Sequence, residues 1–210
     1  MDLASVLAAR ALDVRPGDQV LDLCAAPGGK TLVLAARLGD GSLVANDRSA
    51  ARRRRLRRVL DLYLPPELRA RVRVTGHDAR RWGLHEPARY DRILLDAPCS
   101  TDRHVLADPA ALARWSPARP RQLCTLQRAM LASALDALRP GGTLVYATCS
   151  LCPEENDGAI AWLHRKRPGR FEVLEPGGSR GSPTEFGCFL RPDRDGGSGP
   201  LYFARLRRRA

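Results

Sequence analysis

The sequence predicts an α/β fold with a mostly parallel, seven-stranded sheet that has helices on both faces. Short apolar runs with strand character alternate along the chain with longer runs of helical periodicity. Turns rich in glycine and proline separate these runs. The 210 residues show no internal repeat and no linker on the scale of a domain. We therefore expect residues 1–210 to form a single domain.

The first half of the chain contains three of the expected helices and four of the expected strands. The turn at residues 15–18 ends the first helix, Ser49 caps the third, and the two prolines at 65 and 66 stop it. The expected helices are residues 4–12, 30–38 and 50–62. The expected strands are residues 19–24, 42–46, 72–75 and 90–95.

The second half begins with a loop punctuated by proline and continues with a long helix at residues 122–138. The turn at 139–142 leads into a strand at 143–148, which a helix at 154–165 follows. Two further runs with strand character complete the sheet, at 171–174 and 201–206. The stretch 175–199 is rich in glycine, serine, proline and aspartate, so we expect a loop there.

Net charge is +12, and every basic residue except Lys30 and Lys166 is an arginine. This balance favours a polyanionic partner, although the arginine bias of a GC-rich genome would produce it equally well. The arginines of residues 52–58 are accordingly either a solvated helix face or contacts to RNA phosphates. No apolar run approaches the ~20 residues that a membrane helix needs, and the first residues lack the layout of a secretory signal. We expect no membrane association and no export.

Six cysteines are present, and only Cys149 and Cys152 have C-x-x-C spacing. Without a second pair or a histidine at ligand spacing, this motif is weak support for zinc, and we expect no metal. The cysteines are expected to be reduced thiols. We interpret four of them as structural: Cys24, Cys124, Cys152 and Cys188.

A ligand site is expected where the strands end. Asp47, Asp78 and Asp96 lie at or just beyond strand ends, and the glycine-bearing loop 25–29 follows the first strand. An acid about 20 residues after such a loop, here Asp47, suits a ribose diol. The loop is not G-x-G-x-x-G and the chain has no G-x-x-x-x-G-K-[ST] motif, which disfavours a dinucleotide and a nucleoside triphosphate. Cys99 and Cys149 also follow strands of one sheet, so both are expected to face the same cleft.

Three motifs together resemble a known family. Residues 21–31 (Leu-Asp-Leu-Cys-Ala-Ala-Pro-Gly-Gly-Lys-Thr), 96–100 (Asp-Ala-Pro-Cys-Ser) and 148–150 (Thr-Cys-Ser) closely resemble the Sun-domain RNA cytosine-5 methyltransferases. The resemblance covers nearly the whole chain. Residues 101–104 are similar to the mitochondrial ribosomal-RNA branch or its transfer-RNA relative. The fold implied is the Rossmann-like class I methyltransferase fold.

The resemblance implies S-adenosylmethionine as cofactor and RNA, either rRNA or tRNA, as substrate. The cofactor would contact Cys24, Ala25, Ala26, Pro27, Gly28, Gly29, Lys30, Asp47, Asp78 and Asp96. Cys149 would be the nucleophile, and Cys99 would assist release of the product. Asp96 would stabilise the base at N3, and Lys30 would lower the pKa of the nucleophile or orient the base. Arg103 and His104 would lie near the target nucleotide.

The chemistry requires covalent activation, because C5 of cytosine is a poor nucleophile until a thiolate adds to C6. Relatives usually carry an additional N-terminal region that helps to grip RNA, and this chain starts at the edge of the catalytic domain. A partner protein that delivers RNA is therefore expected as one possibility. A mitochondrial location is expected from the branch resemblance, with the targeting segment not in this chain.

Three other functions compete with this one. A DNA cytosine-5 methyltransferase would take its nucleophile from the Pro-Cys motif, which would make Cys99 the nucleophile. A non-catalytic RNA-binding module could retain the cofactor fold, although Asp96, Cys99 and Cys149 are all present. The arrangement of two cysteines gives a small-molecule methyltransferase little support.

Overall fold

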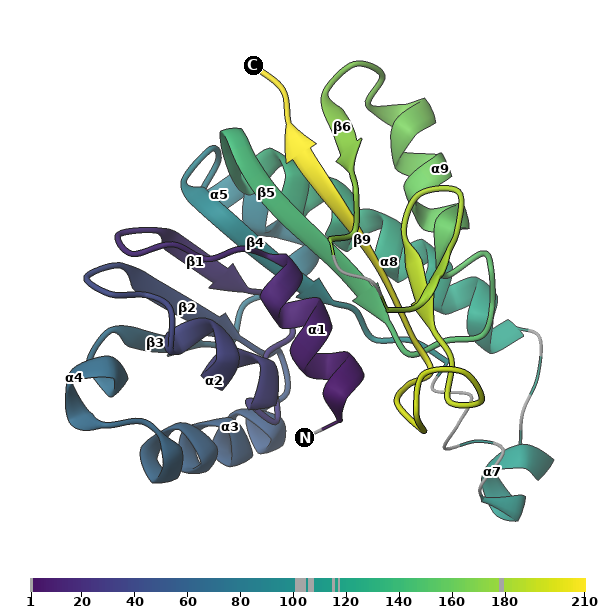
Figure 1. Ribbon diagram of the computed structural model, residues 1–210, viewed down its shortest axis with the longest axis horizontal. Coiled ribbons are helices and arrows are strands. Elements are labelled where there is room, and N and C mark those ends of the chain that lie inside the picture. Colours follow the sequence, from purple (N-terminus) through teal and green to yellow (C-terminus); the bar gives the residue numbers. More distant parts are fainter. Residues whose placement is uncertain (1, 101–104, 106–107, 115, 117, 178–179) are drawn as a thin grey trace.

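The computed structural model describes residues 2–100, 105, 108–114, 116, 118–177 and 180–210. A sheet crosses the molecule, with strand order β3-β2-β1-β4-β5-β9-β8-β7 and β6 paired to β9 (Figure 1). Its five central strands are parallel. They are β3 (Val72–Thr75), β2 (Ser42–Asn46), β1 (Gln19–Asp22), β4 (Tyr90–Asp96) and β5 (Leu138–Thr148).

Antiparallel strands extend the sheet beyond β5. β9 (Leu201–Arg208) pairs with β5 along one edge. Its other edge pairs with β6 (Phe171–Leu174) and with β8 (Cys188–Leu190), and β7 (Ser182–Pro183) pairs with β8. The seven expected strands are all present. The expectation of a loop throughout 175–199 is wrong, because β7 and β8 lie inside it. These short strands depend on the second edge of β9, which local composition does not reveal.

Helices cover both faces of the sheet, as expected. α1 (Leu3–Ala11), α2 (Gly29–Ala35) and α3 (Ala50–Tyr63) pack on one face through a buried cluster that includes Leu34, Leu56 and Leu60. The other face carries η1 (Ala79–Arg81), α5 (Trp82–His85), α8 (Ala118–Ala137) and α9 (Asp157–Lys166). Two short helices, α4 (Pro66–Arg69) and α7 (Pro109–Ala113), complete the described elements.

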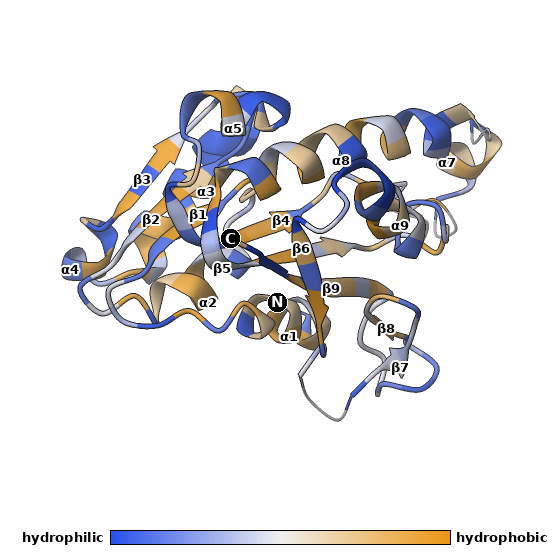
Figure 2. Cartoon of the chain, turned by 90° about the horizontal axis from the view of Figure 1, so that it is seen from above, coloured by the Kyte–Doolittle hydropathy of each residue, from blue (hydrophilic) through white to orange (hydrophobic). Residues whose placement is uncertain are grey.

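The strands alternate their side chains between these two clusters. Leu43 and Ala45 of β2 belong to the cluster under α1–α3, and Val44 belongs to the cluster under α8. The central strands are correspondingly apolar along much of their length (Figure 2). None of the helices in the described ranges has both the length and the apolarity needed to cross a membrane.

Three helix boundaries differ from expectation by three or four residues. α2 ends at Ala35 rather than 38, and the starts of α8 and α9 differ for local reasons. α8 begins at Ala118 rather than 122, with Pro120 in its first turn, where a helical residue needs no N–H partner. α9 begins at Asp157 rather than 154, because residues 153–156 form a turn in which Asn156 N–H donates to Pro153 O at 3.1 Å. That turn buries the side chains of Glu155 and Asn156.

Candidate active site

The order of the strands reverses between β1 and β4. From β1 the sheet grows through β2 to β3, and the chain then returns to the opposite side of β1 to form β4 and β5. Ligands of open α/β sheets bind at the carboxyl ends of the strands beside such a reversal. Here those ends carry the loop that follows β1, Asp96 at the end of β4, and Cys149 just after β5.

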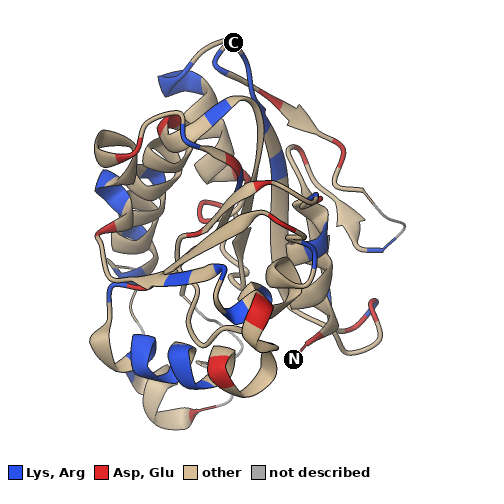
Figure 3. Cartoon of the chain, turned by 90° about the vertical axis from the view of Figure 1, so that its left-hand side faces the viewer, with Lys and Arg blue, Asp and Glu red and all other residues tan. Residues whose placement is uncertain are grey.

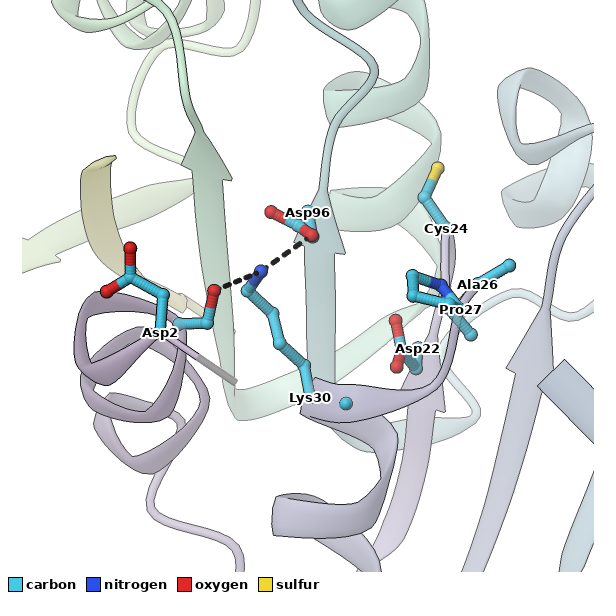
Figure 4. Close-up of a pocket in the computed structure, with 10 residues that line it drawn as sticks. Asp2, Asp22, Cys24, Ala26, Pro27, Lys30 and Asp96 are labelled. Atoms are coloured by element: carbon cyan, nitrogen blue, oxygen red, sulfur yellow. Dashed lines mark hydrogen bonds and ion pairs between the residues drawn. The ribbon is translucent and has the colours of Figure 1, made fainter. Parts of the chain in front are cut away.

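A cavity of about 250 Å³ opens at this point. In Figure 4, Lys30 extends from the start of α2 toward Asp96, and Asp22 lies behind the loop. The cavity is lined by Asp2, Ser5, Asp22, Cys24, Ala25, Ala26, Pro27, Gly29, Lys30 and Asp96. Most of the residues expected in the cofactor loop therefore line one space, together with Asp22.

Gly28 shapes this loop without lining the cavity. Its φ is +116°, a backbone conformation that favours glycine. A Cβ at this position would lie 3.0 Å from Leu56 Cδ1 and 3.1 Å from Val59 Cγ1. Glycine is thus required both by the turn and by the close approach of α3.

Lys30 and Asp96 form an ion pair inside the cavity. Lys30 Nζ lies 2.8 Å from Asp96 Oδ2 and donates to Ser5 Oγ at 3.2 Å, as drawn in Figure 4. The two side chains are 14% and 31% exposed. Burial is the largest single influence and opposes the charged form of Lys30. The charge and hydrogen bond of Asp96, together with Asp22 and Cys149, nevertheless raise the pKa of Lys30. The site therefore contains a fixed ammonium group.

Asp22 is a site residue that the sequence patterns did not predict. Its side chain is buried, and Oδ2 accepts a hydrogen bond from Thr31 Oγ1 at 2.8 Å. Its Oδ1 has no hydrogen-bond partner among the described residues. Burial raises the pKa of Asp22 to about 7, with a further contribution from Asp96 and opposition from the Thr31 hydrogen bond. Asp22 was not predicted as a site residue because it lies inside the expected strand, whereas the predicted acids lie at or beyond the ends of strands.

A second cavity of about 200 Å³ lies on the other side of Cys24 and contains two of the expected acids. Asp47 is buried, accepts from Ser49 N–H at 2.9 Å, and lies 3.2 Å from Arg52 Nε. Asp78 is held by Arg80, whose hydrogen bonds lower the pKa of Asp78 to about 2. The cavity is lined by Leu23, Cys24, Asn46, Asp47, Arg48, Ser49, Arg52, His77, Asp78, Ala79, Pro98, Leu126 and Met130.

Cys99 and Cys149 meet, as expected from their places after β4 and β5. Their Sγ atoms lie 2.9 Å apart, and Cys149 N–H donates to Cys99 Sγ at 3.3 Å. The hydrogen bond from Cys99 lowers the pKa of Cys149; burial and Asp96 oppose this shift, and Lys30 assists it. Burial instead raises the pKa of each cysteine interpreted as structural: Cys24, Cys124, Cys152 and Cys188. The Cys149 thiol therefore ionises at lower pH than an ordinary cysteine.

The arginines of α3 divide into two groups. Arg52 donates to Ala26 O at 2.6 Å and lines the second cavity, whereas Arg53 donates to Asp47 O at 2.8 Å and so supports the loop after β2. Further along the helix, Arg54, Arg55, Arg57 and Arg58 are exposed. Figure 3 shows basic residues on this helix at the bottom of the view.

Arg103 and His104 lie outside the described residues, so their expected contact with the target nucleotide stays a prediction. Within the described ranges, no group of three or more histidine, cysteine, aspartate or glutamate side chains is arranged to hold a metal ion.

Comparison with known proteins identifies relatives of this chain. A 5-cytosine rRNA methyltransferase NSUN4 of Bos taurus is 41% identical over 98% of this chain and 58% of its own length. A mitochondrial tRNA (cytosine(34)-C(5))-methyltransferase of Mus musculus is 36% identical over 99% of this chain and 63% of its own. The crystal structure of NSun6 from Pyrococcus horikoshii with SFG superposes with a TM-score of 0.82, at 30% identity, over 99% of this chain and 52% of that one.

The chain therefore spans about three fifths of the length of the bovine and murine relatives. The Rossmann-like α/β methyltransferase fold is confirmed by the solved structure and by the sheet described above. The family model described as 16S rRNA methyltransferase RsmB/F matches residues 9–206, which is nearly the whole chain. This protein belongs to that RsmB/F family of methyltransferases.

Proposed function

We propose that this chain is an S-adenosylmethionine-dependent RNA (cytosine-5)-methyltransferase that acts through a covalent bond between Cys149 and C6 of the base. The observation that carries the proposal is the contact between the thiols of Cys99 and Cys149 at 2.9 Å, beside the Lys30–Asp96 ion pair. The names of the bovine and murine relatives support the same reaction.

The two cavities suit the two halves of the cofactor. Asp47 and Asp78 line the cavity proposed for the adenosine half, where carboxylates suit a ribose diol and a ring amino group. Asp22 lines the cavity proposed for the methionine half, and its unpartnered Oδ1 suits an ammonium group. Cys24 lines both cavities. When bound, S-adenosylmethionine supplies an electrophilic methyl group on its sulfonium sulfur.

The first step proposed for the chain's own residues is addition of the Cys149 thiolate to C6 of cytosine, which forms an S–C6 bond and makes C5 nucleophilic. Lys30 favours the thiolate through its positive charge. The Asp96 carboxylate takes up the proton that leaves the Cys149 thiol and donates it to N3 of the base while electron density builds up on the ring. C5 then accepts the methyl group.

Cys99 completes the proposed cycle. Once the Cys149 sulfur is bonded to C6 it no longer accepts the Cys99 hydrogen bond, and Cys99 gives its own proton to water. The Cys99 thiolate then takes the proton from C5, the C5–C6 double bond re-forms, and the S–C6 bond breaks to return the Cys149 thiolate. The sulfur of Cys99 is placed for this because it already contacts that of Cys149. Attack at C6 needs the cytosine out of its stack, so a loop or a flipped nucleotide is the form of RNA that would enter.

The finer identity of the substrate rests on the relatives, one named for rRNA and one for tRNA. We infer an RNA of one of these two classes, with a partner protein that delivers it as a further component. The murine relative's mitochondrial name supports a mitochondrial location for this chain.

The test is direct detection of the product. The chain is incubated with isotopically labelled S-adenosylmethionine and with separate rRNA and tRNA pools, and the nucleosides are analysed by mass spectrometry. Labelled 5-methylcytidine with the wild type, and none with Cys149→Ser, supports the proposal. Cofactor binding without labelled nucleoside on either RNA pool, including after addition of an extract from the source cells, would favour the non-catalytic RNA-binding alternative.

A further inference from the structure

The two cysteine loops are held together by a buried carboxylate that has no place in the chemistry above. We propose that Glu155 is a positioning residue that sets the separation of Cys99 and Cys149 by binding the residue that follows each of them. The inference rests on the proposed function for its catalytic consequence, but the geometry that it describes can be tested without RNA.

Glu155 accepts hydrogen bonds from the two cysteine loops and from α8. Its side chain is fully buried. Oε2 accepts from Ser100 N–H at 3.0 Å and from Gln127 Nε2 of α8 at 2.7 Å, and Oε1 accepts from Ser150 Oγ at 3.0 Å. Ser100 directly follows Cys99, and Ser150 directly follows Cys149. One carboxylate therefore binds both cysteine loops and ties them to the helix behind.

The two serines are also joined to each other, with their Oγ atoms 2.8 Å apart. A hydroxyl has one proton to donate, and that of Ser150 is directed to Glu155, so Ser100 donates to Ser150. Ser150 Oγ accepts in addition from Cys152 N–H at 3.0 Å. The chain Ser100–Ser150–Glu155 thus runs in one direction and ends on the carboxylate.

The backbone at Glu155 is anchored independently. Tyr146 of β5 donates its hydroxyl proton to Glu155 O at 2.6 Å, and Gln127 Nε2 also donates to Pro98 O at 2.8 Å. Burial of a carboxylate is costly unless its hydrogen bonds are satisfied, and an apolar side chain would fill the same volume at lower cost. A buried carboxylate at this position therefore does not maximise stability. Its hydrogen bonds instead fix the distance between the two cysteine loops.

That distance matters because the hydrogen bond from Cys99 is the main cause that lowers the pKa of Cys149. The other groups that face Cys149 electrostatically are Asp96 and Lys30, neither of which contacts Glu155 through a described hydrogen bond or ion pair. Loss of the Glu155 carboxylate would let the two loops separate, and the Cys149 thiol would then ionise at higher pH.

The test measures alkylation of Cys149 by iodoacetamide against pH, with the modified peptide quantified by mass spectrometry, on the full chain. We expect Glu155→Ala to move the alkylation profile to higher pH. In methyl transfer we expect kcat to fall by about 100-fold, as a displacement near 1 Å can cause, with KM for the cofactor unchanged.

Asp157→Ala is the matched control. Asp157 lies two residues away and also accepts from several donors, including Thr184 Oγ1 and Tyr202 OH. This control is expected to destabilise the fold without moving the profile.

Two further variants keep the inference falsifiable if Glu155→Ala does not fold. Glu155→Gln can retain the acceptor for Ser100 and Gln127, and can donate to Ser150 if the serine chain reverses direction, so its profile is expected near the wild-type one. Ser150→Ala removes the hydrogen bonds of the Ser150 hydroxyl but leaves the Glu155 carboxylate bound to Ser100 N–H and to Gln127, so it is expected to give a smaller shift than Glu155→Ala, in the same direction. A folded Glu155→Ala or Ser150→Ala protein with the wild-type profile would overturn the inference. Absence of methyl transfer by the wild type would refute the proposed function and leave the alkylation result interpretable.

Discussion

Asp22 makes the fold less stable as pH rises, which is opposite to the usual effect of an aspartate. Burial raises its pKa from 3.8 to about 7. Because the folded protein holds this proton more tightly than the unfolded chain, the stabilisation is complete below pH 3.8 and is lost as pH rises through about 7. At about 1.36 kcal/mol for each pKa unit, the difference corresponds to about 4 kcal/mol. Asp22→Asn removes the titrating group.

The assay is urea unfolding of the wild type and Asp22→Asn between pH 4 and pH 8, where the pKa shift acts. The free energy of unfolding of the wild type, taken relative to the variant, should fall by about 4 kcal/mol across this range. Titrating groups that do not interact with Asp22 cancel in the difference, which leaves Asp22 and its neighbours Asp96 and Lys30. Thr31→Val supplies a second check, because the Thr31 hydrogen bond opposes the shift and its removal should extend the loss of stability to higher pH. A difference that does not change with pH would refute this account of Asp22.

Three further predictions concern the loop at Gly28, the cation at Lys30 and the exposed arginines of α3. Gly28→Ala places alanine in a left-handed backbone conformation and brings its Cβ within 3.0 Å of Leu56. The free energy of unfolding should therefore fall by about 2 kcal/mol, which should lower Tm by roughly 4 to 8 °C in calorimetry. Lys30→Met removes the cation beside Cys149 and leaves Asp96, so alkylation of Cys149 should require higher pH. Replacement of Arg54, Arg57 and Arg58 by glutamine should weaken RNA binding, and each phosphate of single-stranded RNA left without its arginine should reduce the salt slope by about 0.7.

Matched variants separate these effects from general damage. Gly141 also has a positive φ, +78°, but a Cβ there would meet nothing within 4 Å, so Gly141→Ala should cost less than Gly28→Ala. Equal losses of stability would contradict the packing argument. Arg191→Gln removes an arginine that is already paired with Asp193 and should leave RNA affinity nearly unchanged. If the triple variant binds RNA as the wild type does, the exposed arginines of α3 are a solvated face.

Much of the fold follows from local sequence. The strands Ser42–Asn46, Val72–Thr75 and Phe171–Leu174 have the expected bounds, because each is a short apolar run between turn signals. The pair β7 and β8 could not be predicted in this way. Ser182–Pro183 has no strand pattern of its own and is ordered by pairing with Cys188–Leu190, which pairs in turn with β9.

The site was predictable to the extent that it follows from topology. Asp96, Cys99 and Cys149 lie together because parallel strands end at the same edge of the sheet. Asp22 and Glu155 were not predicted, since burial of a carboxylate is a property of the packed structure and their sequence positions resemble a strand interior and a helix start. The structure also shows that Lys30 lies against Asp96, a pairing that spacing alone could not indicate.

The central claim, that Cys149 is the nucleophile and Cys99 assists release, is tested most directly by trapping the covalent adduct. Wild type, Cys99→Ala and Cys149→Ala are incubated with S-adenosylmethionine and RNA, and protein–RNA adducts are separated on denaturing gels. The account predicts that Cys99→Ala accumulates an adduct, because the bond to C6 forms but is not released, and that Cys149→Ala forms none. An adduct that persists in Cys149→Ala and is lost in Cys99→Ala would contradict it and assign the nucleophile to Cys99, as in the DNA cytosine-5 class.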